Sequence, residues 1–160
     1  ATAGELLIGL KIKELIESGM DKKNIIDTIE EFIKNMKTLF VLENLDNLMK
    51  NGRMNKIVVR IATVMQIRPI LGSDGEGNIA FFSKAKGTRA AIEKLCQMIG
   101  EQCQDTKDRI LAITHCNNEE QAMRLKKMAE DMYSFKQIVV TKTRGLASMY
   151  ANEGGIVVAF

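Results

Sequence analysis

The spacing of apolar residues along the chain changes near residue 38. In residues 5–18 the large aliphatic side chains recur at helical spacing, and Gly19 ends that run. A second run with the same period follows Asp21, whose carboxylate is a suitable N-cap. Beyond it, short apolar runs alternate with longer amphipathic segments. The pattern predicts two leading helices, followed by a unit in which strands and helices alternate.

Six segments after residue 37 have the length and composition of strands. The turn sequence "SDGEGN" separates the second from the third and predicts a hairpin. Pro69 has no N–H for a strand ladder, so it belongs near a strand start or on an edge. The predicted strands are 38–44, 67–73, 79–84, 109–115, 135–142 and 154–160, and the helical segments among them are 45–52, 55–66, 88–104 and 117–132.

This order predicts an α+β fold, a six-stranded mixed and largely antiparallel sheet with helices packed on it. The two leading helices bring no strand of their own. We therefore expect residues 1–37 to be the helical remnant of a truncated N-terminal α/β domain, and residues 38–160 to be a C-terminal α+β domain. The chain begins with Ala, which suggests a fragment or a trimmed chain.

The first residues, "ATAGELLIGLK", lack the basic start of a signal peptide. No segment approaches the roughly 18 uncharged apolar residues of a membrane span. Cys96 and Cys103 are seven positions apart on one predicted helix, so their Cα atoms would lie about 10 Å apart, too far for a disulfide. Together these features predict a cytoplasmic protein with reduced thiols.

Composition leaves the role of the interior open. Aromatic residues make up 5% of the chain and Trp is absent, so aliphatic residues and ten Met must fill the core. Because Met adapts to irregular spaces, such a core is either ordinary packing or the lining of a pocket for a flexible ligand.

Positive charge is concentrated in residues 50–89. This stretch holds eight Lys and Arg against Asp74 and Glu76, a balance of +6, which leaves −3 for the rest of a chain of net charge +3. Such a stretch is either a solvated surface or a site for an anionic partner. An anion-, nucleic-acid- or acidic-protein-binding module is thus an alternative function. Phe81 and Phe82 are strand neighbours and cannot stack on one face, so we expect no nucleic acid.

Motifs of catalysis are scarce. The sequence has no Walker loop, no GxGxxG after a strand, no GxSxG and no HExxH. The single imidazole, His115, is next to Cys116, and neighbours on a strand point to opposite faces, so a nucleophilic pair is not expected. The spacing of His and Cys does not fit a zinc site. We expect no catalytic residue, no metal and no cofactor, and a structural role for His115.

The glycines before the last strand allow two interpretations. In "NEGGIVVAF" the loop could direct backbone N–H groups at an anion. It could equally be a tight connection between a helix and a strand.

Five motifs in order carry a family resemblance. They are "TLFVLENLDNLMKNGRMNK", "IRPILGSDGEGNI", "KAKGTRAAIEKL", "ILAITHCNNEEQAMRLKK" and "GGIVVAF". In this order they resemble the DegV family of bacterial fatty-acid-binding proteins. That family shows a strand, "LxxLxxGGRI", an amphipathic helix, "KPIL", a hairpin, "KxRxRxKAxxxL", "IxHxxxxEEAxxL" and "HTGPGxLGxxF". The resemblance runs from Thr38 to Phe160, and the first 37 residues fit the helical end of the preceding domain.

The resemblance implies a two-domain acyl carrier that binds one long-chain fatty acid. The tail would lie in the C-terminal domain and the carboxylate at the domain junction. It also implies delivery of the carboxylate to a fatty acid kinase subunit related to dihydroxyacetone kinases, with no catalysis by the carrier itself. Physically, burial of each CH₂ contributes about 0.8 kcal/mol, whereas the carboxylate needs donors or a cation at the pocket mouth.

Head-group candidates are assigned from the family pattern. Arg53 stands at the Arg that follows the paired glycines, although Asn51 replaces the first Gly. Lys86 stands where the family has Arg in "KxR", which keeps the charge and loses the bidentate fork. Thr2 corresponds to the head-group hydroxyl. We expect these three residues to bind the head group or to dock the kinase.

The terminal loop departs from the family pattern. "YANEGG" stands where "HTGPGA" is expected, so Tyr150 replaces the head-group His, and we expect Tyr150 and Asn152 of this loop to contact the head group or the docked partner. A phenol donates one hydrogen bond but is neutral at pH 7. Glu153 replaces Pro and adds a negative charge near the proposed anion site, which is unfavourable unless its side chain points away. The candidates for the acyl-tail pocket are Ile57, Ile61, Val64, Met65, Ile67 and Met149, although the helix that carries the first four could simply cover the sheet.

Overall fold

A computed structural model describes residues 2–54 and 66–160 of the chain. Its strands are β1 (Thr38–Val41), β2 (Ile67–Ser73), β3 (Ile79–Lys86), β4 (Ile110–His115), β5 (Gln137–Lys142) and β6 (Ile156–Ala159). Its helices are α1 (Thr2–Glu17), α2 (Lys22–Asn35), α3 (Asp46–Lys50), α5 (Gly87–Gln102), α6 (Glu119–Met132) and α7 (Gly145–Ala151).

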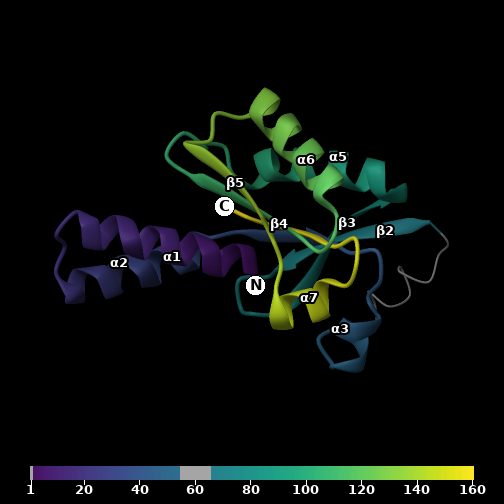
Figure 1. The fold of residues 1–160 in the computed structure, drawn as a ribbon, viewed down its shortest axis with the longest axis horizontal. Coiled ribbons are helices and arrows are strands. Elements are labelled where there is room, and N and C mark those ends of the chain that lie inside the picture. The colour runs from purple at the N-terminus through teal and green to yellow at the C-terminus, as the bar shows by residue number, and fades with distance from the viewer. Residues whose placement is uncertain (1, 55–65) are drawn as a thin grey trace.

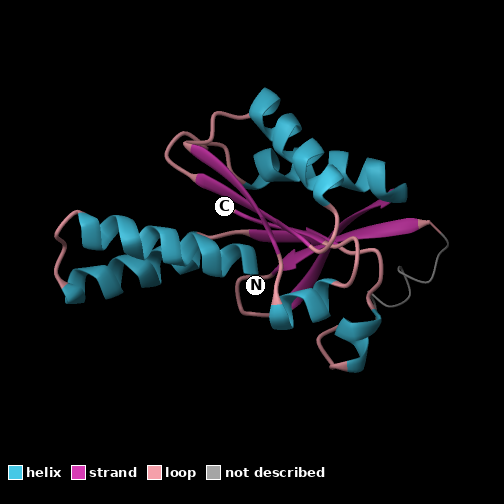
Figure 2. Ribbon diagram, viewed as in Figure 1, coloured by secondary structure: helices cyan, strands magenta, loops and turns pink. Residues whose placement is uncertain are grey.

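The strands form one sheet in the order β3-β2-β1-β6-β4-β5 (Figures 1 and 2). The pair β4 and β5 is parallel, and the other four neighbouring pairs are antiparallel. Helix α6 connects the two parallel strands, as a parallel connection requires. The predicted mixed, largely antiparallel α+β sheet is confirmed.

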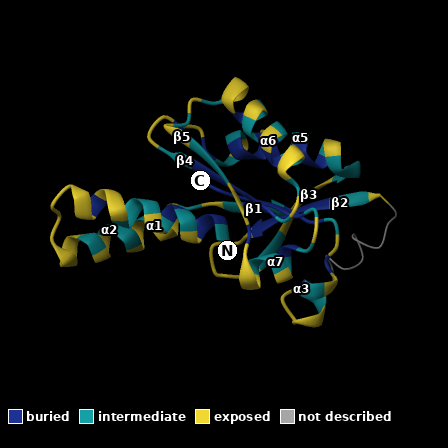
Figure 3. Ribbon diagram, in the orientation of Figure 1, coloured by how far each residue is buried: buried dark blue, intermediate teal, exposed yellow. Residues whose placement is uncertain are grey.

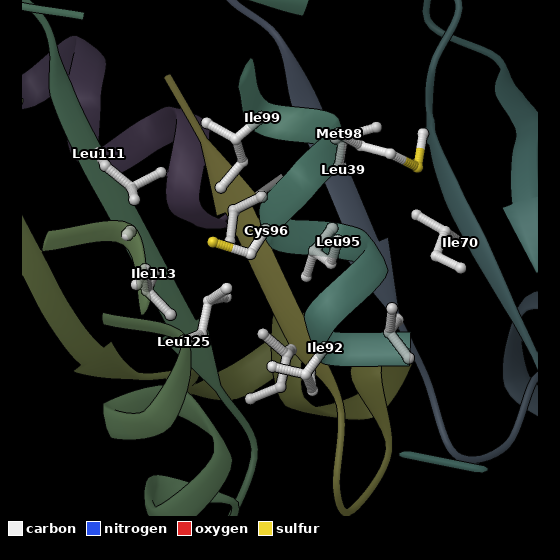
Figure 4. Packing of buried hydrophobic residues seen from close by; sticks show 14 of the residues in the cluster. Leu39, Ile70, Ile92, Leu95, Cys96, Met98, Ile99, Leu111, Ile113 and Leu125 are labelled. Atoms are coloured by element: carbon white, nitrogen blue, oxygen red, sulfur yellow. The ribbon is translucent and has the colours of Figure 1, made fainter. Parts of the chain in front are cut away.

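Helices α5 and α6 cover one face of the sheet (Figure 2). Alternate strand residues point toward them, among them Leu39 of β1 and Val158 of β6, both fully buried. Figure 4 shows Ile92, Leu95 and Ile99 of α5 packed over these strands. This layer is the main hydrophobic core, and in Figure 3 it is the most continuous buried region.

The opposite face of the sheet is covered in two separate places. Helix α1 buries Ala3 and Leu7 against β4 and β6. Helices α3 and α7 contribute Leu48 and Ala151 to a second cluster that includes Leu71 of β2. Helix α2 packs beside α1 and has no buried residue, so the two form an arm that extends from the sheet (Figures 1 and 3). The face between these two contacts is left open.

Several local predictions agree with the structure. Asp21 caps α2 by accepting hydrogen bonds from the N–H groups of Lys23 and Asn24. The Asp74–Asn78 turn joins β2 to β3 as an antiparallel hairpin. Pro69 precedes the part of β2 that pairs with β1, near the strand start. The cysteines are free thiols.

Other parts of the prediction differ or lie outside the description. Helix α7 was not predicted from the sequence. The predicted first strand is shorter than expected and ends at Val41. The helix predicted over 55–66 falls, except for its last residue, outside the described residues. The division of the chain at residue 37 stays a prediction.

Candidate functional site: a hollow on the open face of the sheet

A hollow of about 1680 Å³ lies on the sheet face that α1, α3 and α7 cover only in part. It continues past the start of β1 and the end of β2 to the last turn of α5. Pockets for single small ligands measure roughly 300–1,000 Å³, so this is a wide groove with room for a long ligand. No helix of the described residues is long and apolar enough to cross a membrane.

The floor and walls of the hollow are mostly apolar. Phe40 and Leu42 project from the end of β1 on the side opposite Leu39, as strand alternation requires. Leu48 of α3 and Leu146 of α7 stand on its walls, and Leu146 is 68% exposed. The sequence did not lead us to these residues, although the alternation in "TLFVL" marks Phe40 and Leu42 as a second face.

Charge along the hollow favours an anionic ligand. Five cationic and three acidic side chains are among its described lining residues, and the cationic surplus raises the local concentration of anions. The cations are Lys34, Lys37, Arg53, Lys142 and Arg144, and the acids are Glu5, Asp74 and Glu101.

The structure brings three predicted head-group residues to the same hollow. Thr2 lies at the start of α1, Arg53 follows α3, and Tyr150 lies in the last turn of α7. Lys86 and Asn152 are described but do not line the hollow. Of the predicted tail residues, Ile67 and Met149 do not line it either, and Ile57, Ile61, Val64 and Met65 lie outside the described residues.

Backbone hydrogen bonds hold Arg53 close to α3. Its N–H donates to the carbonyl of Leu48 at 2.9 Å, after Gly52 has turned the chain with φ +64°. A left-handed turn of this kind is easiest for glycine and commonly ends a helix. The side chain of Arg53 is exposed at the edge of the hollow.

Tyr150 is half-buried against the cluster formed by α3, α7 and β2. Helix α7, which carries it, is tied to the end of β5 by the hydroxyl pair Thr143 and Ser148 at 2.9 Å. The N–H of Thr143 donates to the carbonyl of His115 at 2.8 Å, which joins this corner to β4. The phenol ring is thereby held beside α3 at the hollow.

Three asparagines connect α3 to the loop after α7. The side-chain amide of Asn47 donates to Oδ1 of Asn152 at 2.7 Å and to the carbonyl of Met149 at 2.6 Å. The amide of Asn152 donates to the carbonyl of Asn44 at 3.1 Å. Asn152 has φ +54° and ψ 171°, a backbone region that is essentially restricted to glycine.

The glycines of the terminal loop serve the fold. The N–H of Gly154 donates to the carbonyl of Cys116 at 2.8 Å, and that of Gly155 to the carbonyl of Asn152 at 3.3 Å. Gly154 also has φ +87°, and a Cβ there would collide with the side chain of Glu43. Of the two interpretations from the sequence, the tight helix–strand connection agrees with these bonds.

His115 is buried and has a structural partner, as expected. Its Nδ1 accepts a hydrogen bond from the N–H of Asn118 at 3.1 Å, and burial lowers the pKa of the imidazole. The side chain of Asn118, the N-cap residue of α6, makes no capping hydrogen bond, and its amide donates instead to the carbonyl of Gly154 at 2.7 Å. Burial also raises the pKa of the Cys96 thiol to about 11, so it is protonated at neutral pH.

The described residues of the candidate site form a largely apolar groove with cations along it. Among residues 2–54 and 66–160, no three His, Cys, Asp or Glu side chains are placed to hold a metal ion. The arrangement is suited to holding an elongated amphiphile, with apolar contacts along its length and cations near its anionic end.

The chain is similar to proteins of one known family. The model described as "Uncharacterised protein, DegV family COG1307" matches residues 1–160. A DegV domain-containing protein from Streptococcus gordonii is 29% identical over 161 residues, which is all of this chain and 57% of that protein. The chain thus spans little more than half the length of the curated relatives it matches.

Solved structures agree in fold. A DegV family protein from Ruminococcus gnavus, refined with vaccenic acid, is 36% identical with a TM-score of 0.91, covering 98% of this chain and 56% of that one. One from Eubacterium eligens, loaded with heptadecanoic acid, is 28% identical with a TM-score of 0.86, covering 95% and 54%. The Fatty Acid Kinase (Fak) B3 protein of Streptococcus pneumoniae, loaded with linoleic acid, is 26% identical with a TM-score of 0.87, covering 96% and 54%. With a family model that matches its whole length, this chain belongs to the DegV family.

Proposed function

We propose that the protein binds one long-chain fatty acid, with the tail in the hollow and the carboxylate near Arg53 and Tyr150. The observation that carries this proposal is the position of both residues on one apolar groove, in a family whose solved members hold fatty acids. The carboxylate then meets a cation and a hydroxyl at the end of the groove, which satisfies an anion that cannot be buried alone.

The hollow can supply the energy that such a ligand needs. Burying the fourteen methylenes of hexadecanoic acid would contribute about 11 kcal/mol, at about 0.8 kcal/mol for each, before the ligand and the groove are ordered. The apolar lining from Phe40, Leu42, Leu48 and Leu146 provides the surface for this burial. The bonds to the carboxylate would set the orientation of the ligand even where they add little net binding energy.

The role we propose is that of a non-catalytic cytoplasmic carrier that presents the carboxylate to a fatty acid kinase subunit and needs no cofactor. Support comes from the fatty acid kinase B3 protein among the structural neighbours. The neutral phenol of Tyr150, at the position where the family pattern has His, means that this chain would hold the carboxylate with a different hydrogen-bond donor.

Titration of the full chain with hexadecanoic acid tests the proposal. Leu146→Asp places a charge on the wall of the hollow, and it should weaken binding about tenfold or more because the tail would lose apolar contact there. Met123→Asp is the matched control, since Met123 is also an exposed large apolar residue, in α6 on the other side of the sheet.

Equal affinities of the two variants would mean that the ligand lies elsewhere. A delipidated wild-type chain that binds no fatty acid would refute the proposed function itself.

A further inference from the structure

We propose that Asn47 and Asn152, with the carbonyl of Asn44, form a clasp that positions Arg53 and Tyr150 for the carboxylate of the ligand. The inference rests on the proposed function and extends it to residues that would not themselves touch the ligand. The clasp consists of the hydrogen bonds that join these three asparagines to each other and to the carbonyl of Met149.

The clasp joins the two walls of the hollow that carry the head-group candidates. Asn47 lies one residue before Leu48, whose carbonyl accepts the N–H of Arg53. On the other side, the carbonyl of Met149 and the side chain of Asn152 lie on either side of Tyr150 in the chain. The positions of Arg53 and Tyr150 are therefore coupled through two short hydrogen-bonded paths that meet at the amide of Asn47.

The backbone of Asn152 indicates that these bonds are needed. A residue with φ +54° and ψ 171° is strained unless it is glycine. Asparagine adopts a positive φ more readily than most other residues. Here both ends of its amide are bonded to α3 or to the residues before it, so the strained residue also links the two walls.

Loss of the clasp should weaken the contacts of the ligand's head group more than those of its tail. The apolar contacts of the tail are spread over β1, α3 and α7 and tolerate small shifts. Hydrogen bonds to a carboxylate weaken steeply when donors are displaced or misaligned, so their strength depends on where Arg53 and Tyr150 are held.

The experiment compares hexadecanoic acid with hexadecanol, which has the same tail and no carboxylate. In the wild-type full chain the acid should bind more tightly than the alcohol. In Asn47→Ala and in Asn152→Gly this preference should fall about tenfold, while binding of the alcohol changes less than about twofold. The double variant should lose no more than either single variant, because both changes open the same clasp.

Asn51→Ala is the matched control. Its amide donates only to the carbonyl of Asn47 among described residues, within the same short helical segment, so the preference for the acid should persist. Glycine accepts a positive φ at position 152 without strain. Asn152→Gly therefore tests the clasp even if Asn47→Ala does not fold.

The outcomes separate the two proposals. Equal weakening of acid and alcohol in the clasp variants would assign the asparagines a purely structural role and overturn the clasp. An unchanged preference in the variants would overturn it as well, and both results leave the proposed function intact. A wild-type chain that binds neither compound, or binds both equally, would refute the head-group site and the clasp together.

Discussion

Replacement of Asn152 separates backbone strain from hydrogen bonding. Both Asn152→Ala and Asn152→Gly remove the bonds to Asn47 and Asn44, a loss of about 1 kcal/mol for each bond. Alanine must then hold φ +54° and ψ 171° with a Cβ and no compensating bond, at a further cost of about 1–3 kcal/mol. Glycine avoids this strain but loses roughly 0.5–1 kcal/mol through the greater freedom of the unfolded chain. The Gly variant should therefore be the more stable of the two by about 1 kcal/mol.

Urea unfolding followed by circular dichroism measures this difference directly. Asp27, in the middle of α2, supplies a control with helical geometry and an exposed side chain. There the order should reverse, with Ala more stable than Gly by about 1 kcal/mol, because glycine is a poor helix former. If the Asn152→Ala variant were at least as stable as Asn152→Gly, the backbone at residue 152 would not be strained. The argument that the clasp is needed to hold that backbone would then be wrong.

Two further predictions concern residues away from the hollow. The hydroxyl oxygen of Tyr133 accepts a hydrogen bond from the N–H of Gly100 in α5, and a Cβ added at Gly100 would lie 2.6 Å from that oxygen. Gly100→Ala should therefore lower the free energy of unfolding by about 1–3 kcal/mol. Gly9→Ala in α1 meets nothing within 4 Å and should be neutral or stabilising in the same urea titration, and equal effects of the two would contradict this packing. Burial lowers the pKa of His115 in the folded chain, so as the pH falls below about 6.5 the imidazole of the unfolded chain is protonated before that of the folded chain. The free energy of unfolding should therefore decrease as the pH falls from about 6.5 to below the folded pKa. His115→Gln should remove that part of the pH dependence between about pH 7.5 and 5.5, and an unchanged slope in urea unfolding would show that other groups cause it.

The sequence was sufficient for the elements with strong local signals. The aliphatic periodicity predicted α1 and α2, the "SDGEGN" turn predicted the β2–β3 hairpin, and Asp21 is the cap that its position suggests. The fold class followed from the order of these elements. The strand order did not, because β1 lies between β2 and β6 through pairings that local patterns do not encode.

The site was predictable only where the family pattern supplied it. Arg53, Tyr150 and Thr2 reach the hollow, whereas Met149 and Ile67 were chosen by closeness in sequence and do not line it. Helix α7 escaped prediction because "GLASMYA" is short and begins with Gly, which is a weak helix signal.

The clasp could not be predicted from the sequence. Its members, Asn47 and Asn152, are 105 residues apart, and each alone looks like an ordinary turn or surface residue. What distinguishes Asn152 is its backbone conformation, which depends on the tight connection from α7 to β6 and on the bonds to α3.

The central claim is that the hollow between α1, α3 and α7 holds the tail of a fatty acid. The most direct test is photo-crosslinking of the full chain with hexadecanoic acid that carries a diazirine near its methyl end, followed by peptide mass spectrometry. We expect crosslinks to residues that line the hollow, and their loss when unlabelled hexadecanoic acid is added in excess. Crosslinks confined to α6 or to the outer surface of α5, or insensitive to competition, would contradict it.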